Sequence, residues 1–174
     1  MPERIRINTQ FTAGKFMHTE DALNLGKIRL FAGTFAGGQM TGHLAHFLDA
    51  DDARVISQIL AGGAEIEFTD FKGRESRPPG GGKAVVSSKL RINLGKNGVY
   101  FFEFAAGPGR RTGHGIVEPV GKPARQVNFF LGQWQARRWG AAVHEYLLAW
   151  QVARMLAHHR HGEGEPPLPL YERR

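Results

Sequence analysis

The chain has 174 residues, no cysteine and a formal net charge of +7 at pH 7. This length suits one domain, and the lack of cysteine excludes disulfides, thiolate metal sites and cysteine nucleophiles. No apolar run approaches the roughly 20 residues that cross a bilayer, and the opening Met-Pro-Glu-Arg-Ile-Arg lacks the apolar core of a signal peptide. We therefore expect a cytoplasmic protein with no membrane partner.

The first half of the chain predicts strands followed by a helix. Two-residue alternation of apolar and polar residues indicates strands at 4–8 and 27–35. A glycine pair then turns the chain into a partner strand at 40–47. We expect Asp49 to open the helix, because its carboxylate can accept hydrogen bonds from unpaired first-turn amides. A second glycine pair, at 62–63, ends the helix.

The second half predicts a similar order of elements. Strands are expected at 64–70, 89–94, 99–105 and 125–131, and the middle two pair across an Asn97-Gly98 turn. Sequence rich in glycine and proline at 77–83 and 107–121 predicts two mobile connections, the second of them basic.

The longest predicted element is a helix at 133–158, followed by an extended tail at 162–174. One stripe of this helix is apolar at helical spacing and contains Trp139, Ala142, Tyr146 and Ala149. A stripe this apolar is expected to pack on the sheet or against a second subunit. We therefore expect a homodimer or a larger homo-oligomer.

The two halves look like variants of one unit. Each half passes through a Thr-Gly-His triplet, at 41–43 and at 112–114, and then reaches an aromatic-Leu pair followed directly by a helix. The second of these junctions reads Leu131-Gly132-Gln133-Trp134. We expect one domain over residues 1–161 that contains this internal repeat, with residues 162–174 as its tail.

A doubled strand-strand-strand-helix unit resembles the Whirly family and the related positive-cofactor-four coactivators, whose unit ends in a strand, a Leu and a helix that opens with a Trp. The Lys-Gly-Lys-Ala-Ala-Leu signature of plant Whirly proteins is absent. The resemblance implies an α+β fold with two antiparallel sheets and two helices. It also implies that single-stranded DNA binds across the sheets and that the helices mediate assembly.

Basic residues are concentrated between positions 71 and 125, where eleven Lys and Arg face only three Glu. Such a field is typical of polyanion binders. Binding of unpaired strands requires cations for the phosphates and flat aromatic faces for the bases. One face of the strand at 27–35 offers both. The residues expected to contact nucleic acid are Lys27, Arg29, Phe31, Phe35, Lys89, Arg91, Tyr100, Arg110 and Arg111.

The core faces of two strands differ in how clearly the sequence marks them. In the strand at 27–35, the alternate face carries Ile28, Leu30 and Ala32 and suits the core. In the strand at 99–105, both faces carry aromatic residues: Tyr100 belongs to one face and Phe101 to the other. One of these two faces must be core, and the sequence leaves open which.

The interpretation is a non-enzymatic, nucleoid-associated protein that binds single-stranded DNA with low sequence specificity during replication, recombination or transcription. No catalytic motif is found, and we expect no cofactor and no bound metal. Three alternatives remain open. They are RNA binding, a metal-dependent nuclease that uses His43, His46 and His114, and an adaptor whose sheet or Pro-rich tail binds another protein. Against the nuclease, residues three apart on a strand face opposite sides.

Overall fold

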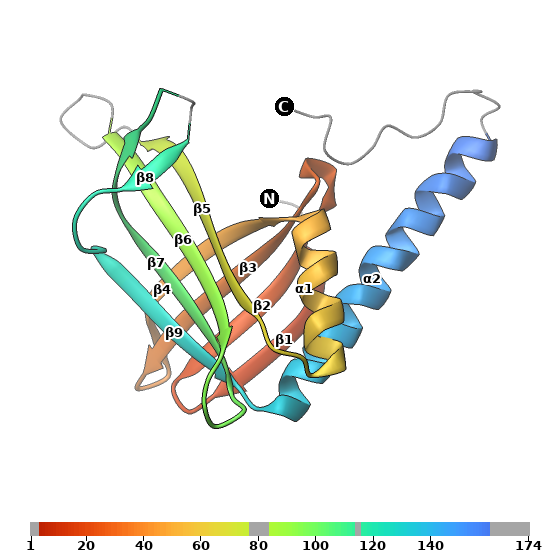
Figure 1. The fold of residues 1–174 in the computed structure, drawn as a ribbon, viewed down its shortest axis with the longest axis horizontal. Coiled ribbons are helices and arrows are strands. Elements are labelled where there is room, and N and C mark those ends of the chain that lie inside the picture. The colour runs from red at the N-terminus through yellow and green to blue at the C-terminus, as the bar shows by residue number, and fades with distance from the viewer. Residues whose placement is uncertain (1–3, 77–83, 114–115, 161–174) are drawn as a thin grey trace.

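Two antiparallel sheets and two helices make up the computed structural model, which describes residues 4–76, 84–113 and 116–160 (Figure 1). The first sheet has the strand order β1-β2-β3-β4, and α1 follows its last strand. Their bounds are Arg6–Thr12 (β1), Lys15–Ala22 (β2), Lys27–Ala36 (β3), Gln39–Asp49 (β4) and Ala50–Gly62 (α1), with a short 3-10 turn, η1, at Leu23–Leu25.

The second sheet is organised around one long strand, β7. On one edge β7 pairs with β6, and on the other it pairs first with β9 and then with β8. The bounds are Glu67–Ser76 (β5), Ala84–Leu94 (β6), Tyr100–Arg111 (β7), Val117–Pro119 (β8), Arg125–Leu131 (β9) and Gln133–Arg160 (α2). The strands of the two sheets cross, and both helices lie on the same side of the molecule (Figure 1).

The predicted fold class is confirmed, because each half consists of antiparallel strands followed by a helix. The junctions before the helices also correspond, since Leu48 lies near the end of β4 and Leu131 ends β9. The two Thr-Gly-His triplets do not start at corresponding places in the two halves: Thr41 lies within β4, whereas Thr112 follows the end of β7. The predicted loop at 77–83, the tail at 162–174 and His114 lie outside the described residues.

The segment at 107–121, expected to be a mobile connection, is strand over 107–111 and 117–119. β7 continues through Arg111, and β8 pairs with its last residues. The glycines there permit close packing: a Cβ on Gly109 would come within 2.7 Å of a Val117 methyl and 3.0 Å of the Ser87 nitrogen. The prediction took the glycines of this segment as a sign of flexibility. Gly109 instead lets neighbouring strands approach closely.

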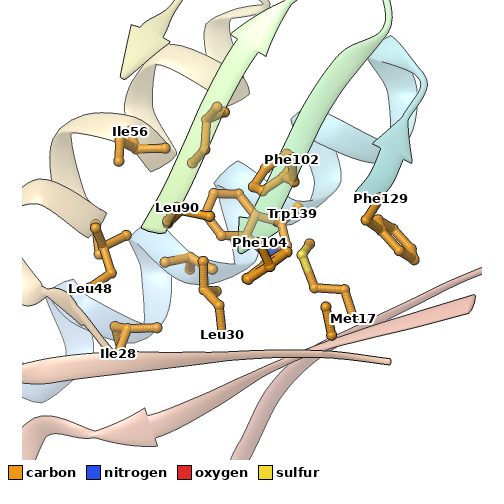
Figure 2. Packing of buried hydrophobic residues seen from close by; sticks show 14 of the residues in the cluster. Met17, Ile28, Leu30, Leu48, Ile56, Leu90, Phe102, Phe104, Phe129 and Trp139 are labelled. Carbon is orange, nitrogen blue, oxygen red and sulfur yellow. The ribbon is translucent and has the colours of Figure 1, made fainter. Parts of the chain in front are cut away.

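The core lies between the inner faces of the two sheets and the helices (Figure 2). Trp139 of α2 is fully buried in it, and the indole Nε1–H donates to the Thr19 hydroxyl of β2 at 2.8 Å. Tyr146, two turns further along α2, donates to an Asp21 carboxylate oxygen at 2.7 Å. Burial and that hydrogen bond raise the pKa of Tyr146 to about 12. The second half of the chain is thereby joined to the first.

The two helices approach each other closely at Gly140. A Cβ there would lie 2.4 Å from the Ser57 carbonyl oxygen and 2.5 Å from the Ala61 nitrogen of α1, so the crossing leaves no room for a larger residue. Among the described residues, no helix combines the length and apolar character that a bilayer span requires.

Candidate nucleic-acid interface

The outer face of the first sheet carries a continuous band of aromatic rings, which we call the aromatic stripe. Its members come from all four strands and are Phe11, Phe16, His18, Phe31, Phe35 and His43. Adjacent rings are in contact: the Phe16 ring centroid lies 4.9 Å from that of Phe35 and 5.5 Å from that of Phe31, and Phe31 lies 5.2 Å from His43. Strand pairing therefore assembles rings that are distant in sequence.

Strand alternation explains why these rings face outward. In β3, Ile28, Leu30 and Ala32 are fully buried against the core, as predicted, and the intervening side chains lie on the other face. Phe16 forms the floor of the stripe: it is 2% exposed, and a Cβ on Gly33 would lie 2.4 Å from its ring. Phe35 and Phe11 form the rim and are 40% and 62% exposed. The stripe thus presents ring surface to solvent.

One cation, Arg29, adjoins the stripe, and it affects the charge state of His18 within it. The Arg29 guanidinium lies 4.4 Å from the centroid of the Phe31 ring and forms an ion pair with Glu20. Burial lowers the pKa of His18, and the nearby Arg6 and Arg29 add to this effect while Glu20 opposes it. His18 is therefore a neutral flat ring at neutral pH, hydrogen-bonded to the Thr9 hydroxyl.

A cleft of about 740 Å³ opens beside the stripe and is lined by both sheets. Its lining contains no carboxylate among the described residues, and it shares Arg29 and His43 with the margin of the stripe. Six cationic side chains line it, and together they define the basic cleft: Arg4, Lys27, Arg29, Lys72, Arg74 and Arg125.

Three of these cations are held by carboxylates that stand beside the cleft. Asp49 accepts from Lys27 and from Lys72, each at 2.5 Å, and Lys72 also lies 3.1 Å from Asp70. Arg29 pairs with Glu20. Arg4, Arg74 and Arg125 also line the cleft, and none of them forms an ion pair with a residue that the structure describes.

The Asp49 carboxylate does not cap α1 as predicted. Asp49 precedes the helix with an extended backbone, but its side chain makes no capping hydrogen bond and turns to the two lysines instead. Burial raises the pKa of Asp49, but the hydrogen bonds from Lys27 and Lys72 outweigh it and hold the pKa below its ordinary value. The pKa of Asp70 is likewise lowered, since hydrogen bonds from His46 and Lys72 outweigh burial.

These two aspartates predict loss of stability in acid. A carboxyl whose pKa is lowered on folding stabilises the protein above its unfolded pKa, and that contribution is lost as the pH falls through the folded value. We expect the free energy of unfolding to fall as the pH drops below about 4, the ordinary pKa of Asp. Urea unfolding at a series of pH values measures this. Asp49→Asn should reduce the pH dependence, and an identical dependence in the variant would contradict the assignment.

The structure brings four of the predicted site residues together and separates the others. Lys27, Arg29, Phe31 and Phe35 lie along one face of β3. The pair Lys89 and Arg91 lies on the outer face of the second sheet, where Glu103 and Glu67 bind them at 2.7 and 3.5 Å. The other predicted pair, Arg110 and Arg111, is exposed at the far end of β7.

Tyr100 cannot stack on a base, and its prediction as a contact residue is wrong. Its side chain is fully buried, and its hydroxyl donates to the Ala64 carbonyl oxygen at 2.8 Å. The structure also decides the open question about this strand. Phe102 and Phe104 share the buried face with Tyr100, whereas Phe101 lies on the outer face and contacts Phe130 at 5.0 Å between ring centroids.

Sequence reasoning missed Phe16 and His18 because it did not predict β2, and it missed Phe11 because the first predicted strand ended at residue 8. The segment 15–22 lacks simple alternation: Phe16 and Met17 are adjacent and both buried, one under the stripe and one in the core. The Lys-Phe-x-His spacing, which places Phe16 and His18 on one face, is the signal that could have found them.

The histidines do not form a metal site in the part of the chain that is described. His43 lies at the stripe, whereas His46 points to the opposite side of β4 and is buried. His46 Nδ1 lies 3.0 Å from the Ser88 hydroxyl and its Nε2 lies 2.9 Å from Asp70. These described ranges contain no group of three potential metal ligands.

Comparisons with known proteins extend this description. No protein-family model matches the chain, and no curated protein sequence matches it. The solved structures that share this fold include two whose similarity covers nearly the whole chain. WHY1 from Arabidopsis thaliana has a TM-score of 0.57 and 12% identity, covering 97% of this chain and 99% of that one. The fold is Whirly-like. The plant transcriptional regulator PBF-2 has a TM-score of 0.52 and 12% identity, covering 94% and 97%.

Proposed function

We propose that this protein binds single-stranded nucleic acid, single-stranded DNA above all, without base specificity and without catalysing a reaction. The observation that carries the proposal is the continuity of the aromatic stripe with the basic cleft through Arg29 and His43. Whirly-like architecture and the similarity to a plant transcriptional regulator support a role in transcription, replication or recombination.

The two surfaces match the two chemical parts of an unpaired strand. Exposed bases stack on the rings of Phe31, Phe35 and Phe11, and each base that stacks on an aromatic ring contributes about 1–3 kcal/mol. The phosphates bind the cations of the basic cleft and release counterions. A duplex hides its base faces within its own stack, so the stripe favours single strands.

Low sequence specificity follows from the chemistry of the stripe. All four bases present a flat π-face, so stacking on Phe31 or Phe35 discriminates little among them. Stacking and phosphate contacts also occur with RNA, which differs by a 2′-hydroxyl that needs a directed polar contact to be recognised. Equal retention of DNA and RNA oligonucleotides would therefore leave single-strand binding by this surface in place but would contradict the proposed preference for DNA.

Incubation of the protein with end-labelled single strands, with and without Mg²⁺, tests the proposal. We expect retention of intact strands in both conditions. Cleavage that depends on the metal would favour the nuclease hypothesis, and the absence of retention would favour an adaptor.

Two arginines of the basic cleft, Arg74 and Arg125, form no ion pair within the described residues and therefore predict a change in salt dependence. Arg74→Ala and Arg125→Ala should each make the slope of log affinity against log salt less negative by about 0.7, the value for one single-strand phosphate. Arg138→Ala is the matched control, because Arg138 is exposed on α2 and carries the same charge. Fluorescence anisotropy at several salt concentrations measures the slope. An equal change in the control would mean that only total charge matters.

We also propose that the protein is a homodimer or a larger homo-oligomer. The C-terminal half of α2 runs beyond α1 and away from both sheets (Figure 1). Several of its apolar side chains are exposed: Leu148, Val152, Met155 and Leu156. A run of exposed apolar side chains on one helix favours contact with another copy.

Light scattering tests the assembly. We expect a mass of at least twice the 19.3 kDa of one chain, and Val152→Glu combined with Leu156→Glu should shift the particles toward one chain. A wild-type mass of one chain at micromolar concentration would contradict the proposed oligomer. It would leave the proposed nucleic-acid interface unaffected.

A further inference from the structure

Three charged side chains from three strands meet at the edge of the basic cleft. Asp49 and Lys27 are cross-strand partners at the ends of β4 and β3, and Lys72 comes from β5 of the other sheet. Each lysine ammonium donates to a different oxygen of the carboxylate, Lys27 to Oδ1 and Lys72 to Oδ2, at 2.5 Å each. Both lysines line the cleft.

A backbone phosphate would accept hydrogen bonds from Lys27 and Lys72 in the same way as the Asp49 carboxylate does. A phosphodiester has two non-bridging oxygens that share one negative charge, as a carboxylate does, and ammonium groups bind either anion through charge-assisted hydrogen bonds. Resting on the proposed function, we infer that Lys27 and Lys72 form a phosphate subsite, and that Asp49 occupies this subsite in the free protein as an internal competitor.

The local backbone supports this inference. Asp49 occupies the N-cap position of α1, where the Asp carboxylate usually accepts hydrogen bonds from amides of the first helical turn. Its side chain makes no such bond. The carboxylate therefore binds the two ammonium groups and not the amides of the first helical turn. Those amides remain as alternative hydrogen-bond donors for it.

Exposure distinguishes Asp49 from the other carboxylates beside the cleft. The side chain of Asp49 is 43% exposed, and those of Lys27 and Lys72 are 32% and 31% exposed. The side chains of Glu20 and Asp70 are only 9% and 15% exposed. An incoming phosphate can thus reach both lysines, and Asp49 can turn to water or to the helix amides, whereas Glu20 and Asp70 remain in place.

Competition from Asp49 limits the affinity of the site for a nucleic-acid strand. A strand must displace Asp49 before it gains the two lysines, so the free protein discriminates against anions that offer few other contacts. Removing the carboxylate should release Lys27 and leave Lys72 with Asp70 as its one remaining partner among the described residues, and this should strengthen binding, although the substitution deletes two ion pairs from the folded protein.

The test compares Asp49→Asn with Asp51→Asn, which makes the same charge change at an exposed position of the same helix. Two probes are used: a labelled oligothymidine strand, and inorganic tripolyphosphate, which has phosphates but no bases. Asp49→Ser is a second variant, because serine removes the charge and restores a capping group. Thermal melts confirm that each variant is folded.

We expect Asp49→Asn and Asp49→Ser to bind the strand about three- to tenfold more tightly than wild type, the range for releasing two exposed ion pairs. Asp51→Asn should change affinity less than about twofold, because its charge is screened by solvent. Equal effects at the two positions, or weaker binding by both Asp49 variants, would overturn the subsite. Gains with tripolyphosphate alone, in a protein that ignores single strands, would support the subsite and reject the proposed function.

Discussion

Replacing Trp139 by alanine is expected to lower the free energy of unfolding by about 3–5 kcal/mol, the range for deleting a large buried aromatic side chain. Trp139 is fully buried where α2 meets both sheets, in the same core cluster as Phe102 and Met17 (Figure 2). Its ring lies edge-on to Phe102, with 5.8 Å between the centroids. The substitution also leaves the buried Thr19 hydroxyl without its donor. Urea unfolding monitored by circular dichroism measures the loss.

Two further variants separate the causes of this effect. Trp139→Phe retains most of the packing but leaves the Thr19 hydroxyl unsatisfied, which should cost about 1–3 kcal/mol. Trp134→Ala is the matched control, because Trp134 lies five residues earlier in the same helix and is 71% exposed. It should change stability by less than about 0.5 kcal/mol. If Trp134→Ala cost as much as Trp139→Ala, the proposed placement of α2 against the core would be wrong.

The second large effect concerns the aromatic stripe. Phe31→Ala and Phe35→Ala should each weaken binding of a single strand by about 1–3 kcal/mol, because each removes one stacking surface. The salt slope should remain unchanged, since stacking releases few counterions. Phe130→Ala is the control: this ring is 49% exposed, but it lies on the outer face of the second sheet. Anisotropy titrations measure the affinities.

Thermal melts of the same variants distinguish stacking from folding. Phe35 is at the rim, and Phe31 contacts rings of the stripe and Arg29 and is not part of the buried core, so we expect folded variants with lost affinity. Unfolded variants would mean that these rings hold the sheet together. An equal loss of affinity in Phe130→Ala would contradict the assignment of the binding surface to the aromatic stripe of the first sheet.

The sequence predicted the elements whose patterns are local. The strand at 27–35 alternates cleanly, and its Ile28 face is indeed core. The turn at Asn97-Gly98 and the strand at 125–131 are also found as predicted. These successes have a common cause: alternation and turn chemistry act over a few residues, and tertiary contacts reinforce them here.

The sequence could not predict features that depend on contacts between distant segments. Tyr100 is as suitable for a stacking surface as for a core, and only the second sheet's position decides that it is buried. The basic cleft combines Arg4 with Arg125 and Lys27 with Lys72, pairs that no local pattern associates. Asp49 has the sequence signature of a helix cap, yet two lysines from different strands attract its carboxylate more strongly.

The most direct test of the central claim is a competition between a labelled single strand and two unlabelled competitors, the same strand and its duplex. Stacking on the aromatic stripe requires unpaired bases. We therefore predict that the unlabelled single strand displaces the label at a concentration at least about tenfold lower than the duplex does, as a preference of about 1.4 kcal/mol requires. Displacement by the duplex at an equal or lower concentration would contradict the account.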